Sequence, residues 1–180
     1  TLQLTGVDLR QVAAPASGVL AALAMNGILY QMRGYDPKTG ELAWAAEDTN
    51  LQPAGHIAFN RLGQVVLPGF KAKTGSEFVD VGIEVYDAKT GDLQADRAFG
   101  IIKIDPLSVT PIPTISFDQT GEVAYFAEIA DPSRVWCCSA VDNATCTDLG
   151  KGLKWRSDSL PGGVHTVTRT SSALVAYGSK

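Results

Sequence analysis

The chain has 180 residues, of which 45% are hydrophobic and 19% are charged, and its formal net charge is −4. A chain of this length can bury a core of its own without metal or disulfide staples, and its hydrophobic share argues against disorder. The acidic balance disfavours binding to nucleic acid, and the longest apolar run, residues 19–25, is far short of the roughly 20 residues of a membrane helix. Because the chain begins at Thr1 rather than at a methionine, we expect it to be processed or cut from a longer protein.

The first predicted element is a β-hairpin over residues 23–30, in which apolar residues flank the pair Asn26-Gly27. The next motif, residues 35–42, reads Tyr-Asp-X-Lys-Thr-Gly-acid-Leu. Its Asp side chain can accept backbone N–H groups within a turn, and its Gly supplies the left-handed position of a type I turn with a bulge. We therefore expect Asp36 and Gly40 to be structural turn residues.

Both motifs recur further along the chain. Residues 58–67 again place an X-Gly pair between apolar residues and predict a second Gly-turn hairpin. Residues 86–93 repeat the whole Tyr-Asp-X-Lys-Thr-Gly-acid-Leu motif. We therefore expect Asp87 and Gly91 to be structural turn residues as well.

The C-terminal half continues the pattern in weaker form. Residues 116–126 and 167–177 resemble the Gly-turn hairpin, and between them residues 140–146 keep the Asp and Thr of the turn but have a cysteine in place of the glycine. Four antiparallel strands about every 50 residues are the unit of a β-propeller blade. We therefore predict an all-β fold of antiparallel four-stranded propeller blades, about three to four of them, in one domain of residues 1–180 with repeat starts near residues 19, 56, 114 and 165.

Residues 35–44, Tyr-Asp-Pro-Lys-Thr-Gly-Glu-Leu-Ala-Trp, resemble the repeat of quinoprotein-like (PQQ-repeat-like) β-propellers. Residues 117–125 are also similar to surface-layer and lactonase-like propellers. The resemblance covers roughly residues 19–177 and implies tryptophans packed between blades, for which Trp44, Trp136 and Trp155 are the candidates. The chain departs from the pattern because the second turn motif has no tryptophan at the place of Trp44 and the third lacks its glycine.

The predicted blade count falls below or at the bottom of the range of closed propellers, which have about four to eight blades. We favour a segment of a larger propeller. A ring that a partner chain completes and a self-closed four-bladed ring, with residues 2–4 as the closing strand, are the alternatives. In an open arc the end faces expose apolar residues, and the candidates are Val19, Leu20 and Leu23 at one end and Leu174, Val175 and Tyr177 at the other.

The cysteines Cys137, Cys138 and Cys146 fall in one predicted hairpin, beside the glycosylation sequon that starts at Asn143. Clustered cysteines near a sequon indicate an oxidising compartment, so we expect a secreted or lumenal glycoprotein with a disulfide bond. A loop closed by Cys138–Cys146 and a vicinal Cys137–Cys138 bond are both open as pairings. The second resembles the vicinal disulfide of some quinone-cofactor dehydrogenases.

No catalytic, metal or cofactor residues are predicted. The histidines His56 and His165 lie far from the cysteines in sequence, and no zinc-ligand spacing is visible. We therefore expect a non-catalytic interaction or structural module of a secreted or lumenal protein, with further blades or a protein partner and with carbohydrate open as a ligand. The alternative is part of a propeller enzyme, a quinoprotein-like oxidoreductase or a lactonase-like hydrolase, whose site residues lie outside this chain.

Overall fold

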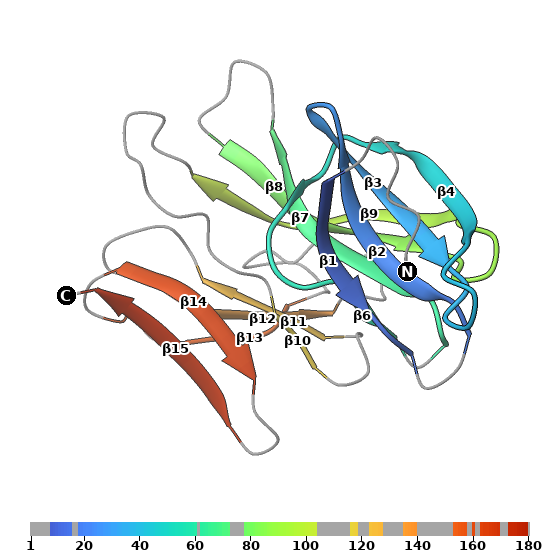
Figure 1. Ribbon diagram of the computed structural model, residues 1–180. Coiled ribbons are helices and arrows are strands. Elements are labelled where there is room, and N and C mark those ends of the chain that lie inside the picture. The colour runs from blue at the N-terminus through green and yellow to red at the C-terminus, as the bar shows by residue number, and fades with distance from the viewer. Residues whose placement is uncertain are drawn as a thin grey trace.

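The computed structural model describes residues 8–15, 18–60, 62–72, 78–103, 116–118, 123–127, 135–139, 153–157, 160, 163–169 and 173–179. In this described part the regular elements are β-strands, and they form four antiparallel sheets that follow one another in chain order (Figure 1). The first and second sheets lie at the right and centre of the view, and the third and fourth lie at the lower left. The predicted all-β fold of propeller blades is confirmed.

The first three sheets have four or more strands and are called the first, second and third blades in chain order. The first blade contains, in spatial order, β1 (Asp8–Ala13), β2 (Leu20–Asn26), β3 (Leu29–Tyr35) and β4 (Leu42–Thr49). The second contains β5 (Gln52–Pro53) and β6 (Ala58–Phe59), which both pair with β7 (Val65–Ala72), and then β8 (Phe78–Tyr86) and β9 (Leu93–Lys103). The third contains β10 (Ser116–Phe117), β11 (Val123–Ala127), β12 (Val135–Ser139) and β13 (Leu153–Arg156), and the fourth sheet contains β14 (Gly163–Arg169) and β15 (Leu174–Ser179).

The sequence of β8 shows why a central blade strand forms here. Successive side chains of a strand point to opposite faces of the sheet. One face of β8 therefore carries its four β-branched residues, which are all buried: Val79, Val81, Ile83 and Val85. The opposite face carries Glu84 and Tyr86, which are buried as well. Both faces of the second blade are thus covered, as in a blade that lies between two others.

The first hairpin motif lies at a different position in its blade from the one we expected. The Asn26-Gly27 turn joins β2 to β3, whereas the turn at Asn60–Gly63 joins β6 to β7 and is one strand earlier in its sheet. The inner strand of the first blade therefore begins at Asp8 and not near residue 19. An X-Gly pair marks any tight hairpin, because it supplies the positive φ that the turn needs, so the motif alone does not say which hairpin of a blade it closes.

A hydrophobic cluster joins the first two blades. Its buried members include Leu23, Met32 and Trp44 from the first blade and Leu67 and Tyr86 from the second. The prediction that Val19 and Leu23 lie on an exposed end face is therefore wrong, since Val19 packs against this cluster and Leu23 is 1% exposed. Leu23 lies on the face of β2 that packs against the second blade.

A smaller cluster of Val135, Cys137 and Val167 joins the third blade to the fourth sheet, and Leu174 packs against it. The prediction that Leu174 lies on an exposed end face is therefore wrong. Val175, on the opposite side of β15, is 45% exposed, as expected for an end face. The proposed closing strand at residues 2–4 lies outside the described residues.

Candidate functional site: the groove between the first two blades

The two Tyr-Asp-X-Lys-Thr-Gly motifs form the turns β3–β4 and β8–β9 and have the same internal geometry. Oδ1 of Asp36 accepts the backbone N–H groups of Lys38 at 2.7 Å and Thr39 at 3.0 Å, and Gly40 has a φ of 76°. The hydrogen bonds from Thr39 and then Lys38 hold the pKa of the Asp36 carboxyl below its ordinary value.

In the second turn, Oδ1 of Asp87 accepts Lys89 N at 2.7 Å and Thr90 N at 3.1 Å, and Gly91 has a φ of 79°. The same kind of backbone hydrogen bonds, from Lys89 and then Thr90, lowers the pKa of Asp87. These contacts give both aspartates a structural role at the turns, which is the role that the motif predicts.

Trp44 of the first blade packs against the second turn. The indole Nε1–H of Trp44 donates to the carbonyl oxygen of Ala88 at 2.9 Å. A Cβ placed on Gly91 would lie 2.5 Å from Cε3 of Trp44, so only glycine leaves room for the ring. Trp44 is 7% exposed and packs between the blades. For Trp136 and Trp155, the side chains lie outside what the structure describes.

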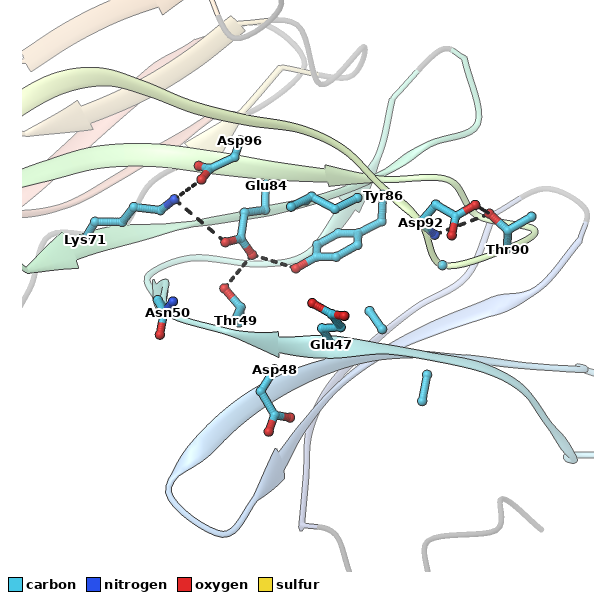
Figure 2. Close-up of a pocket in the computed structure, with 14 residues that line it drawn as sticks. Glu47, Asp48, Thr49, Asn50, Lys71, Glu84, Tyr86, Thr90, Asp92 and Asp96 are labelled. Carbon is cyan, nitrogen blue, oxygen red and sulfur yellow. Dashed lines mark hydrogen bonds and ion pairs between the residues drawn. The ribbon is translucent and has the colours of Figure 1, made fainter.

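Beside this contact, a groove of about 590 Å³ separates β4 from the sheet of β7, β8 and β9. Figure 2 shows Glu47 on the side of β4 that faces Tyr86, and Asp48 on the opposite side. The apolar part of the lining comes from Ala45, Ala46 and Leu93. Carboxylates outnumber cations among the lining residues, because Lys71 is their one cation.

Glu84 is the centre of the polar contacts in the groove (Figure 2). Its Oε2 accepts the hydroxyl of Thr49, from the first blade, at 2.5 Å and the hydroxyl of Tyr86 at 2.6 Å. Its Oε1 lies 4.0 Å from Nζ of Lys71, which also forms an ion pair with Asp96. The Glu84 side chain is 6% exposed, so a buried carboxylate is satisfied by two hydroxyl donors and an ammonium group.

Burial raises the pKa of the Tyr86 hydroxyl, and the hydrogen bond to Glu84 raises it further. Tyr86 therefore keeps its proton and acts as a fixed donor to Glu84. The arrangement can hold the two blades together and can orient Lys71 at the edge of the groove.

Sequence reasoning missed Glu84, Thr49 and Lys71. A signal was available for Glu84, because it interrupts the apolar residues of a strand whose other face is entirely β-branched. No local signal marks Thr49, since its partner is 35 residues away. The contact exists only because the two blades pack face to face.

The cysteine and glycan predictions are not tested by these contacts. Cys137 is buried in β12 and belongs to the cluster that joins the third blade to the fourth sheet. Cys138 follows it in the strand, and its side chain is outside what the structure describes. Cys146 and Asn143 lie outside the described residues altogether.

Within the described ranges, no group of three or more His, Cys, Asp or Glu side chains could hold a metal ion. Nor does that part of the chain contain a helix long and apolar enough to cross a membrane.

No family model matches this chain, and no curated protein matches it. Among solved structures, it is similar to Kuenenia stuttgartiensis hydrazine synthase, with a TM-score of 0.56 and 14% identity over 95% of this chain and 58% of that chain. It is also similar to the Dos1 propeller, with a TM-score of 0.54 and 13% identity over 94% of this chain and 42% of that chain. At these identities the likeness shows the fold alone. The protein is of the β-propeller class, and the chain spans about half the length of these two matched structures.

Proposed function

We propose that this chain is a non-catalytic interaction or structural module of a larger β-propeller assembly. The observation that carries the proposal is an exposed apolar side chain on each outward face of the arc. On β1, Gln11 is bonded to the second blade, because its Nε2 donates to Gly55 O at 2.8 Å and its Oε1 accepts Ile57 N at 2.9 Å. Its neighbour Val12 therefore points to the outward face, where it is 47% exposed.

The fourth sheet has the same property at the other end. Leu174 packs against the cluster that joins the fourth sheet to the third blade, so Val175 points to the opposite side and is 45% exposed. The described part of this sheet contains two strands, whereas the preceding sheets contain four or more. A single exposed valine is ordinary on a protein surface, and it supports the proposal because the faces of repeat units such as blades are covered by neighbouring units. Further blades fit them best, because the chain covers only 58% and 42% of the two propeller-type chains that it matches.

Native mass spectrometry of the 180-residue chain tests this proposal. We expect the chain to self-associate at micromolar concentration, and we expect Val12→Lys and Val175→Lys to shift it toward monomer. Ile28→Lys is the matched control, because Ile28 is 89% exposed in the β2–β3 turn and lies on neither outward face. A stable wild-type monomer that unfolds in one cooperative transition would contradict the proposal and favour a self-closed ring.

We propose further that the protein is secreted or lumenal. The support is the cluster of Cys137, Cys138 and Cys146 next to the sequon at Asn143. Expression through a secretory pathway, followed by intact mass with and without reductant and glycosidase, tests both parts. A chain with three free thiols and no glycan after secretion would contradict them.

The quinoprotein-like character of the repeat is likewise a proposal, supported by the docking of Trp44 on the turn of the next blade. It predicts that further blades of the assembly carry the same turn and a tryptophan on the outermost strand. The sequence of the complete open reading frame tests it.

A further inference from the structure

We propose that the groove between β4 and the sheet of β7, β8 and β9 binds an arginine side chain carried by an extended segment of a partner protein. This inference rests on the proposed function, because it names the chemistry of a partner for a chain that we propose to be an interaction module. The groove, of about 590 Å³, is within the range of roughly 300–1,000 Å³ in which proteins bind their ligands. None of its lining residues belongs to the end faces at β1 and β15.

A β-bulge interrupts β4 beside the groove. In the ladder with β3, the two residues Ala46 and Glu47 stand opposite the single residue Met32. A bulge of this kind shifts the alternation of side chains along its strand, and bulges are frequent beside functional sites because they redirect a side chain. In β4 the redirected side chain is that of Glu47.

Glu47 is on the groove side because of this bulge. Trp44 and Thr49 both contact the second blade, although they are five residues apart and strict alternation would place them on opposite faces. Alternation back from Thr49 places Glu47 on the groove side and Asp48 on the other, as Figure 2 shows. Glu47 is exposed, and within the described residues it forms no ion pair. The first wall of the groove therefore presents a carboxylate without a cationic partner.

The second wall is acidic as well. Glu84 of β8 and Asp96 of β9 are paired directly across the ladder, and Asp92 lines the groove just before β9 begins. Lys71 forms ion pairs with Glu84 and Asp96, and it is the one cation among the lining residues. Together with Glu47 on the first wall, these carboxylates outnumber the single ammonium group. The groove is therefore electrostatically complementary to a cation.

Glu84 also has hydrogen-bond capacity left. An ionised carboxylate accepts about four hydrogen bonds. Oε2 of Glu84 accepts the hydroxyls of Thr49 and Tyr86, whereas its Oε1 accepts none within the part of the chain that the structure describes. The Lys71 ammonium group, 4.0 Å from Oε1, is an ion-pair partner but lies beyond hydrogen-bond distance. The Glu84 side chain is 6% exposed, so a buried acceptor without a donor lines the groove, and it indicates an N–H ligand independently of the net charge.

An arginine side chain fits these groups better than a single ammonium ion. The guanidinium group is planar and carries five N–H donors in a fixed fork, so it can donate to two carboxylates at once. Glu47 and Glu84 lie on opposite walls of the groove, and a guanidinium group between them can donate to both. The apolar part of the lining, from Ala45, Ala46 and Leu93, suits the methylene part of the side chain.

The backbone at the groove favours an extended protein segment over a small guanidinium compound. β4 and β9 are the outermost strands of their sheets, so each has one edge that no strand of the described part pairs with. Residues 45–50 all line the groove, which means that the backbone of this stretch borders it as well as its side chains. An extended segment can pair with such an edge through its own backbone while one of its side chains enters the groove.

Peptide display on the immobilised chain tests the proposal. The probe is a library of random decapeptides, selected in parallel on wild type, Glu47→Gln and Asp48→Asn. Both substitutions remove one negative charge from an exposed residue of β4, but only Glu47 is on the groove side. We expect selection on wild type to enrich arginine over both the input library and lysine. Asp48→Asn should keep this enrichment, and Glu47→Gln should lose it.

The affinity of one selected peptide then gives the size of the effect. Replacement of its arginine by citrulline, which has nearly the same shape without the charge, should weaken binding at least about tenfold, and Glu47→Gln in the chain should do the same. Asp48→Asn should change the affinity less than about twofold. Competition with N-acetylarginine amide identifies the occupant, because a small compound that binds as tightly as the peptide would overturn the partner segment.

Thermal melts of the two chain variants report whether they are folded. Arginine enrichment that is absent on wild type, no greater than that of lysine, or unchanged on Glu47→Gln overturns the proposal. Equal loss on Asp48→Asn overturns it as well, because it would show diffuse attraction to an acidic chain. None of these outcomes changes the self-association that tests the proposed function, so the two proposals fail separately.

Discussion

The turns Asp36–Gly40 and Asp87–Gly91 are nearly identical in themselves and differ in what surrounds them. In both, an aspartate caps two backbone N–H groups and a glycine with positive φ closes the turn. Trp44 of the first blade lies against Gly91 of the second turn and donates to Ala88 there, whereas among the described residues no tryptophan makes the same contact with the first turn. A repeated local motif therefore fixes the turn, whereas the neighbouring blade decides whether the turn also serves as a docking point.

Removing the indole gives the largest expected effect. Trp44→Ala deletes a buried aromatic side chain and its hydrogen bond to Ala88, and we expect it to lower the free energy of unfolding by about 3–5 kcal/mol. Urea unfolding followed by circular dichroism measures the loss. Trp44→Phe should recover most of it, because the ring remains. A loss below about 1 kcal/mol for the alanine variant would mean that the second turn is no more of a docking point than the first.

Substitutions of Gly40 and Gly91 distinguish backbone strain within the turn from a clash with Trp44 of the neighbouring blade. Gly40→Val should cost more than about 1 kcal/mol, because a β-branched residue fits positive φ poorly. Gly91→Val should cost at least about 1 kcal/mol more, because its Cβ also meets the Trp44 ring. Chemical denaturation of both variants tests the order. Equal losses would show that Trp44 moves aside without cost.

The tyrosines before the two turns, Tyr35 and Tyr86, allow the two regions to be compared by removing a single hydroxyl group. Tyr86→Phe leaves Glu84 with one hydroxyl donor fewer and should cost about 1–3 kcal/mol. Tyr35→Phe removes a buried hydroxyl without a partner and should be neutral or stabilising. Thermal unfolding of the isolated chain distinguishes them. A destabilised Tyr35→Phe would show that this hydroxyl already has an acceptor.

The smallest effect concerns pH. The pKa of Asp36 and that of Asp87 are lower in the folded chain than in the unfolded one, so each carboxylate stabilises the fold above its unfolded pKa. This contribution is lost as pH falls through the folded value, below roughly pH 4. The double variant Asp36→Asn/Asp87→Asn should keep the caps and show a shallower fall in the urea midpoint between about pH 4 and 2. An unchanged fall would mean that neither turn contributes to the acid sensitivity.

Local sequence patterns were enough to predict the turns, the alternation of the strands and the blade class. These features are local: Asp36 and Gly40 act within six residues of each other, and alternation along β8 follows from the pleat of a single strand. The motif misplaced the first repeat start, because the Asn26-Gly27 pair marks a hairpin without identifying its place in the sheet. The pairing of β1 with β2 is what shows that the first blade starts one strand before the Asn26-Gly27 hairpin.

The tertiary structure decided the rest. Glu84, Thr49 and Lys71 come together across two blades, and no local pattern encodes a contact between strands that are 35 residues apart. The direction of Leu23 was decided in the same way, since alternation gives two faces but not which of them a neighbour covers. The repeat makes Tyr35 and Tyr86 equivalent in sequence, and packing makes them different, because the acceptor beside Tyr86 is Glu84 and the residue in that place beside Tyr35 is Arg33.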